Sequence, residues 1–89
     1  MALIRIPGAL RQLTANQAEV EIEATTVRTA LAALEQKHPG IGGKVMDGAT
    51  VKPFIRIYVG PDDFEGLQGL DTPVNARDEI SIIPAIAGG

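Results

Sequence analysis

The residues best suited to chemistry are the last three in the sequence, Ala87-Gly88-Gly89. A segment without side chains at Gly88 and Gly89 can thread a narrow channel of another protein and bring a carboxylate against a nucleotide, where a Cβ atom would clash. A terminal carboxylate with a pKa of about 3.5 is ionised at neutral pH and is a poor electrophile, so it must first be converted, for example into an acyl-adenylate. The activated acyl group can then accept sulfur and become a thiocarboxylate. The alternative is that these glycines reflect only a floppy chain end, because small residues accumulate there.

The usual catalytic arrangements are missing from the sequence. It has no Cys and one His, which excludes thiolate nucleophiles, disulfides and zinc sites that need several such ligands. His38 falls at a predicted helix end, where histidine most often only complements the helix dipole. Asp62, Asp63 and Glu65 cluster without the regular spacing of a calcium-binding loop. The glycines of residues 40–43 follow a helix, whereas a phosphate-binding loop opens one. We therefore expect no bound cofactor and no metal, and a carrier rather than an enzyme.

Composition and charge favour one small globular domain. The 89 residues are 45% apolar and 21% charged, and the net charge of −3 leaves the basic residues scattered, so nucleic acid is not an expected partner. No apolar stretch approaches the roughly 20 residues of a membrane span, and no secretory signal opens the chain. We expect a cytoplasmic protein that contacts neither nucleic acid nor membrane.

The elements that must position the C-terminal residues follow from hydrophobic periodicity. Residues 19–23 alternate strictly between acidic and branched apolar side chains, which predicts an outer strand with one wet face. Residues 27–38 have apolar side chains on one helical face after the possible N-cap residues Thr25 and Thr26, which predicts the main helix. The other expected elements are a strand at 3–6, a loop with its own bend at 9–18, a short helical turn within 41–47, a loop at 48–52, a strand at 53–59, a polar loop at 62–69, a short strand or helical turn within 70–76, and a last strand at 79–83 that Pro84 ends.

This order predicts an α+β fold, a mixed sheet of four to five strands with one main helix packed across one face. Residues 1–84 would form the domain and residues 85–89 a flexible C-terminal tail.

The two-residue period of the strands then predicts a docking patch on the sheet face turned away from the helix, with four large apolar residues beside two arginines. The alternative is that these residues form no docking patch, because single exposed apolar residues are common on protein surfaces. The residues predicted to face away are Leu3, Arg5, Phe54, Arg56, Tyr58, Ser81 and Ile83, and Ile86 of the tail is added to the partner-binding set.

The end of the sequence carries a resemblance to a known family. A strand, a proline, a short aliphatic segment and Gly-Gly follow one another over residues 80–89, after a strand that ends Ile6-Pro7 and a capped helix at 26–38. In these respects the chain resembles the β-grasp, ubiquitin-like sulfur carriers, a family that includes the small subunit of molybdopterin synthase and the thiazole-biosynthesis carrier. Within it, residues 40–41, 46–47, 57–59, 69–70 and 83–89 are similar to carriers that supply sulfur for cysteine synthesis from O-phosphoserine.

The resemblance implies a set of partners. An E1-like adenylyltransferase/sulfurtransferase would use ATP to adenylate Gly89, with Ala87 and Gly88 threaded into it, and a sulfur source would form the thiocarboxylate. A pyridoxal-phosphate-dependent cysteine synthase would receive the sulfur, and a metal-dependent peptidase would free the cysteine. The molybdopterin synthase small subunit ends similarly, so that enzyme's large subunit is the alternative acceptor, and carriers of this family can also become attached to lysines. The hypothesis from another class is a noncovalent ubiquitin-like binding module with an idle tail.

Overall fold

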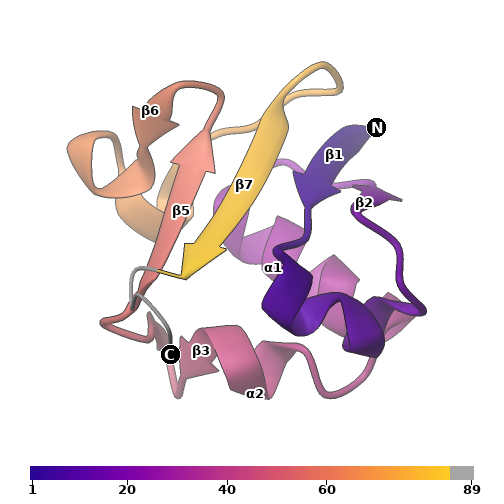
Figure 1. Ribbon diagram of the computed structural model, residues 1–89. Helices are drawn as coiled ribbons and strands as arrows, with labels where there is room; N and C mark the ends of the chain where they lie inside the picture. The colour runs from indigo at the N-terminus through magenta and orange to yellow at the C-terminus, as the bar shows by residue number, and fades with distance from the viewer. Residues whose placement is uncertain (85–89) are drawn as a thin grey trace.

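The five-stranded sheet is arranged around the strand that comes last in the chain. The computed structural model describes residues 1–84, and in it the strands lie in the order β2-β1-β7-β5-β6 (Figure 1). β1 and β7 run parallel, while the β1–β2, β5–β7 and β5–β6 pairs are antiparallel. The predicted mixed sheet with one main helix is therefore confirmed, and residues 19–22 form an edge strand as expected. The strand bounds are β1 Ala2–Arg5, β2 Glu19–Ile22, β5 Ile55–Val59, β6 Asp62–Asp63 and β7 Glu79–Pro84.

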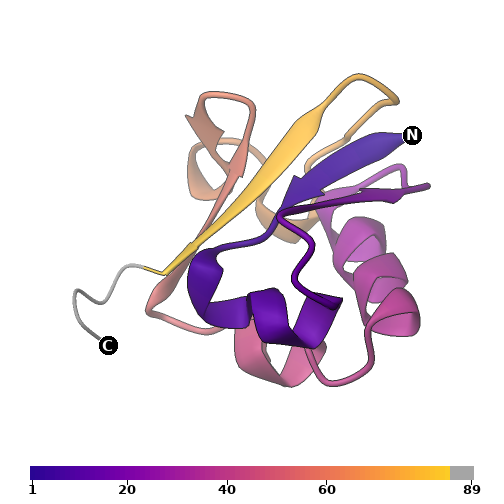
Figure 2. The same ribbon diagram turned by 45° about the vertical axis from the view of Figure 1, so that its right-hand side comes forward.

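Helix α1 (Val27–Lys37) packs across one face of this sheet (Figure 2). Thr26 is its N-cap: the Thr26 hydroxyl accepts a hydrogen bond from the Thr29 backbone N–H at 3.2 Å, and the Thr29 hydroxyl accepts one from the Thr26 N–H at 3.0 Å. This reciprocal pair satisfies two backbone donors that a helix start leaves without partners. His38 follows the helix as its C-cap. The predicted helix is thus confirmed to within one residue at its C-terminal end.

The core lies between α1 and the sheet and consists mainly of branched aliphatic side chains. Alternate residues of each strand point into it, because successive side chains of a strand lie on opposite faces. Ile4, Ile57 and Ile80 are 0% exposed on the three adjacent strands β1, β5 and β7. The remaining buried apolar residues are Ala2, Ile6, Val20, Ile22, Val27, Ala30, Leu31, Leu34, Ile41, Val45, Ile55, Phe64, Val74 and Ile82.

The connections contain short elements, two of which correct the sequence prediction. The 48–52 segment, predicted as a loop, contributes β4 (Thr50–Val51), which pairs with β3 (Met46–Asp47) in a separate hairpin. The 62–69 segment, also predicted as a polar loop, contributes β6 to the main sheet and buries the ring of Phe64. The other short elements are the 3₁₀ helices η1 (Gly8–Thr14), η2 (Phe64–Gly66) and η3 (Gly69–Asp71) and the helix α2 (Gly42–Val45).

The paired strands β5 and β7 differ from their predicted limits. β5 starts at Ile55, because Pro53 and Phe54 lie in a turn before it. β7 includes Pro84, whereas the predicted strand ended at residue 83, just before this proline. The β1 partner register stops at Ser81, so the end of β7 has only β5 beside it, and a residue without an N–H is tolerated at such an open edge.

Candidate functional site

Strand β7 leads directly to the predicted site. Ile86, Ala87, Gly88 and Gly89, for which the sequence predicted roles in partner binding, threading and activation, lie outside the described residues. The last described residue, Pro84, is paired with Ile55 of β5. The described chain therefore ends beside the start of β5, and the surroundings of Pro84 are the part of the site that the structure describes.

The sheet side turned away from α1 brings together most of the predicted patch. We call it the open side, and it carries Leu3, Arg5, Arg56, Tyr58, Ser81 and Ile83. Arg56 lies opposite Ile83 in the β5–β7 register, and Tyr58 lies opposite Ser81. Ile83 is 45% exposed, and Tyr58 is half-buried. The role of the open side as a docking surface stays a prediction.

The two arginines of the open side are held by carboxylates of neighbouring strands. Arg5 pairs with Glu79 on β7 and, at 3.5 Å, with Glu19 on β2. The hydrogen bond and charge of Glu79 raise the pKa of the Arg5 guanidinium above its usual value. Desolvation opposes this rise, and Glu19 adds a smaller contribution to it.

Arg56 is held in the same way. Arg56 Nη1 lies 2.9 Å from Glu65 Oε1 and 3.7 Å from Asp63 Oδ2. These pairs explain the acidic cluster noted in the sequence: two of its carboxylates neutralise Arg56. Much of the charge on the open side is thus already paired.

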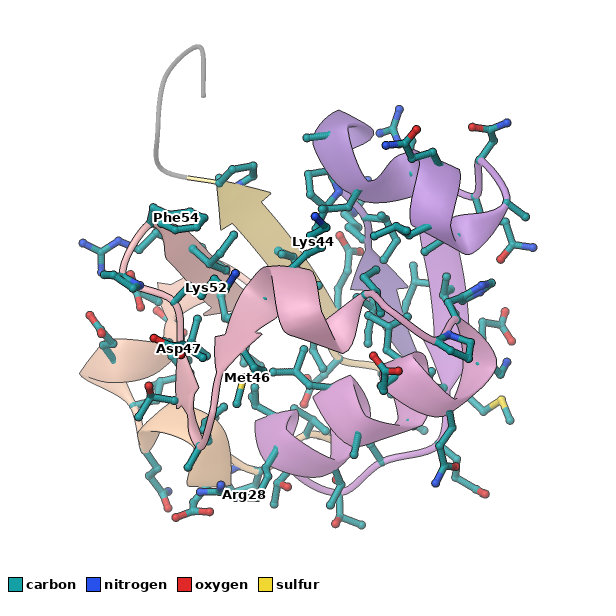
Figure 3. The ribbon with its side chains drawn as sticks, turned by 90° about the horizontal axis from the view of Figure 1, so that it is seen from below. Arg28, Lys44, Met46, Asp47, Lys52 and Phe54 are labelled. Carbon is teal, nitrogen blue, oxygen red and sulfur yellow. The ribbon has the colours of Figure 1, made fainter. Side chains whose placement is uncertain are left out.

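Phe54 lies apart from the strand registers of the open side. It sits in the turn before β5 and is 37% exposed. It lines a pocket of about 300 Å³ at the end of β7, which we call the β7-end pocket. Figure 3 shows Phe54, Lys44 and Lys52 gathered at this end of the molecule. The complete lining is Ala9, Leu10, Lys44, Lys52, Phe54, Ile55 and Pro84.

Lys44 and Lys52 are the residues of this region that sequence reasoning missed. They come from α2 and from the segment between β4 and β5, which were predicted only as a helical turn and a loop. A two-residue hairpin loop with Gly48 at a φ of +66° was the available signal, because such loops favour glycine at their first position. Lys52 Nζ lies 5.8 Å from the centre of the Phe54 ring, within reach of a cation–π interaction.

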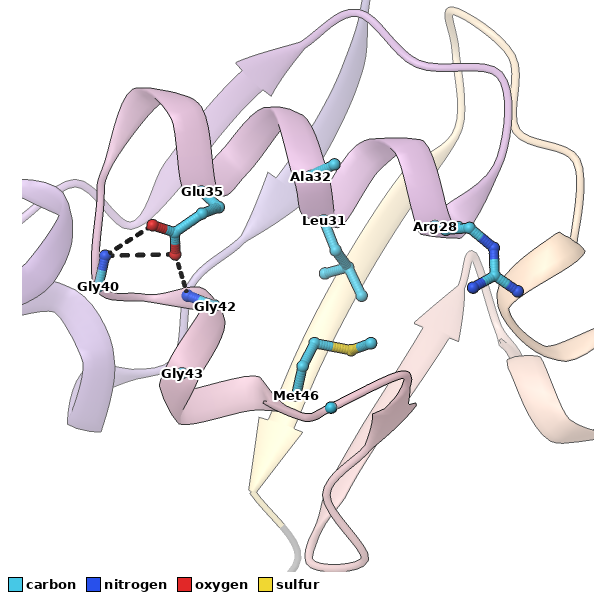
Figure 4. A pocket seen from close by; sticks show the side chains of 9 residues that line it. Arg28, Leu31, Ala32, Glu35, Gly40, Gly42, Gly43 and Met46 are labelled. Atoms are coloured by element: carbon cyan, nitrogen blue, oxygen red, sulfur yellow. Dashed lines mark hydrogen bonds between the residues drawn. The ribbon is translucent and has the colours of Figure 1, made fainter.

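A second, larger pocket of about 600 Å³ lies between α1 and α2, where Leu31 and Met46 point toward one another (Figure 4). The Glu35 carboxylate on its rim accepts hydrogen bonds from the backbone N–H groups of Gly40 at 3.0 Å and Gly42 at 2.6 Å. These bonds tie the end of α1 to the start of α2. The Glu35 carboxylate is thus occupied in holding the fold together, and Arg28, the other charged residue of the lining, is paired with Asp71 at 3.3 Å.

Other kinds of site find no support in the part of the chain that the structure describes. Residues 1–84 contain no group of three or more His, Asp or Glu side chains arranged to hold a metal ion. None of the helices in this range is both long and apolar enough to cross a membrane.

Comparison with known proteins gives consistent matches over nearly the whole chain. The model of the ThiS family matches residues 4–89. The chain is 33% identical to the sulfur carrier protein CysO of Mycobacterium tuberculosis, over 97% of this chain and 96% of that protein. It is also 33% identical to a putative sulfur carrier protein of Archaeoglobus fulgidus, with the same two coverages.

A solved structure supports the same assignment. In the crystal structure of the Amycolatopsis orientalis BexX/CysO complex, the similar chain superposes with a TM-score of 0.95 at 31% identity, and the match covers 100% of both chains. Fold, sequence and family model agree, and this protein belongs to the ThiS family.

Proposed function

We propose that this chain is a sulfur carrier whose Gly89 carboxylate is adenylated by an E1-like enzyme and converted to a thiocarboxylate. The observation that carries the proposal is that the family match extends through residue 89 and so includes Gly88 and Gly89. The similarity to proteins named as sulfur carriers, over 97% of the chain, supports it. Residues 1–84 then act as the recognition domain and residues 85–89 as the tail that enters the enzyme.

The proposed chemistry takes place in two steps on the terminal carbonyl carbon. A carboxylate oxygen of Gly89 attacks the α-phosphorus of ATP held by the partner, and pyrophosphate leaves. Hydrosulfide then attacks the carbonyl carbon of the acyl-adenylate, AMP leaves, and a thiocarboxylate and a proton are formed. The absence of side chains at Gly88 and Gly89 lets the tail enter a narrow channel.

The most favoured acceptor is a pyridoxal-phosphate-dependent synthase that makes cysteine. This choice follows from the similarity to CysO proteins, one of which forms a complex with a protein named BexX. That complex also supports action through docking on a larger partner. The large subunit of molybdopterin synthase is the second candidate acceptor, favoured by the similar order of strand, proline and Gly-Gly at residues 80–89.

Intact mass spectrometry tests the proposal directly. The wild-type chain is incubated with ATP, sulfide and a purified E1-like adenylyltransferase of the same organism. We expect a mass increase equal to the exchange of one oxygen atom for sulfur, and no increase after deletion of Gly89 or addition of one residue after it. Gly66→Ala is the matched control, because Gly66 lies far along the chain from the tail and a Cβ atom there meets no atom within 4 Å. Equal sulfur loading of a blocked terminus would contradict the proposal. Partner binding by a wild-type chain that never gains mass would favour a noncovalent module.

A further inference from the structure

The β7-end pocket lies at the last described residue of the chain. Pro84 is both the last residue of β7 and part of the pocket wall. The five residues 85–89 span at most about 18 Å when fully extended, so a catalytic centre that reacts with Gly89 comes within that distance of Pro84. An enzyme that approaches so closely covers surface around Pro84, since stable protein interfaces extend over many residues on each side.

The pocket walls are apolar. Leu10 from η1 packs against the core, Ile55 is only 6% exposed, and the Phe54 ring and Pro84 complete the lining. A volume of about 300 Å³ is at the small end for a ligand site. An aliphatic side chain of a partner is the occupant that such a small apolar recess fits.

The rim of the pocket is basic in a protein whose net charge is −3. Within residues 1–84, neither Lys44 nor Lys52 has a carboxylate oxygen within 4.0 Å, whereas Arg5, Arg28 and Arg56 are all in ion pairs. Two ammonium groups beside an apolar recess attract carboxylates, and such rim charges act mainly on association rate and specificity.

We infer that the β7-end pocket binds a segment of the tail-activating enzyme in which an aliphatic side chain is flanked by acidic residues. The aliphatic side chain enters between Leu10, Phe54 and Ile55, and the carboxylates pair with Lys44 and Lys52. This inference rests on the proposed function, because it takes the activating enzyme as the partner. It adds a contact site that positions the whole carrier, separate from the threading of the tail.

Steady-state kinetics of tail activation test the inference, with the purified E1-like adenylyltransferase and full-length carrier as varied substrate. We expect Lys44→Glu and Lys52→Glu each to raise the KM for the carrier about three- to tenfold with little change in kcat, because they repel the acidic segment before chemistry begins. Ala9→Trp, which fills the pocket without changing its charge, should raise KM similarly. The KM of the wild type should rise with salt concentration, and the KM of Lys52→Glu should rise less steeply.

Arg77→Glu is the charge-matched control. Arg77 is exposed, has no ion pair within residues 1–84, and precedes β7 at the end opposite Pro84, so its KM should equal that of the wild type. Circular dichroism melts of all variants check that the fold is retained.

Several results would overturn the inference. If the wild type is activated but the lysine variants match Arg77→Glu, the pocket inference fails while the proposed function stands. If the wild type never gains the acyl-adenylate or thiocarboxylate, the proposed function fails and the pocket inference falls with it. A wild-type dimer that Lys52→Glu dissociates would assign the pocket to a second copy of this chain instead.

Discussion

The two sides of the sheet are built from the same strands by different physical means. On β5, Ile57 lies on the side of the sheet that α1 covers, the helix side, and is 0% exposed. Its neighbour Arg56 is exposed on the open side and paired with carboxylates. Burial of an aliphatic side chain contributes about 1.5–3 kcal/mol, whereas exposed ion pairs contribute little. The difference teaches that the helix side determines stability, which leaves the composition of the open side free to serve partner recognition.

The largest effect that separates the two sides is expected from isoleucine truncation. Ile57→Ala removes fully buried methyl groups and should lower the free energy of unfolding by about 2–5 kcal/mol. Ile83→Ala, on the open side at 45% exposure, is the matched control and should change it by less than about 1 kcal/mol. Urea denaturation measures both. Similar losses for the two variants would show that the open side is also structurally packed.

The next effect concerns the contact that joins α1 to α2 on the helix side. A Cβ atom at Gly42 would lie 2.6 Å from Glu35 Oε1, so Gly42→Ala displaces the carboxylate from the Gly40 and Gly42 N–H groups. We expect a loss of about 1–2 kcal/mol from these hydrogen bonds. Faster amide exchange at Gly40 in NMR spectra would accompany it.

Gly43→Ala is the control for this variant within the same short helix. A Cβ atom at Gly43 meets nothing within 4 Å, so alanine there should be neutral or stabilise by up to about 1 kcal/mol through its better helix propensity. Equal stability of the Gly42 and Gly43 variants would mean that Glu35 does not hold the loop.

A smaller effect is expected at the start of α1. Thr26→Ala removes the hydroxyl that accepts from the Thr29 N–H, and this should cost about 1 kcal/mol. Thr25→Ala serves as control, because the Thr25 contact to Thr29 uses its backbone N–H and survives the substitution. Thermal melts followed by circular dichroism compare the two, and equal shifts would contradict the capping role.

The helix side was the more predictable from sequence, for the same physical reason that makes it stable. Its burial imposes a period on the chain: two residues in the strands and 3.6 in α1, with Thr26 preceding the first turn. The strands that sequence reasoning missed, β3, β4 and β6, are two residues long, too short for any period to show. Phe64 is buried within a polar stretch because η2 folds it back, which only tertiary structure reveals.

The candidate site was predictable only in part. Gly88 and Gly89 could be proposed from sequence because the feature on which their role rests is local, a lack of side chains, and that role stays a prediction. The β7-end pocket could not, because it joins η1 near the start of the chain, the segment from α2 to β5 in its middle, and Pro84 near its end. Gly48 signalled only the β3–β4 hairpin between Lys44 and Lys52, and neither lysine stands out by itself, since a lysine is ordinarily a solvated surface residue.

The smallest expected effect is on the open side, at the ion pair of Arg5 and Glu79. In a double-mutant cycle with Arg5→Gln and Glu79→Gln, the changes in unfolding free energy should add within experimental error, because both side chains are about half exposed. The matched cycle on the helix side, Thr26→Ala with Thr29→Ala, should show coupling, since those two hydroxyls form one capping unit.

The pH dependence of this pair sharpens the same comparison. Because Glu79 raises the pKa of Arg5, any stabilisation from Arg5 is fully present below its unfolded-state pKa and is lost only as the pH rises through the higher folded-state value. Both values lie far above neutrality, so Arg5→Gln should leave the pH profile of stability unchanged around neutral pH. A coupling for Arg5 and Glu79 as large as that of the threonine pair would show that the open side, too, is built for stability, and the division of labour between the two sides of the sheet would not hold.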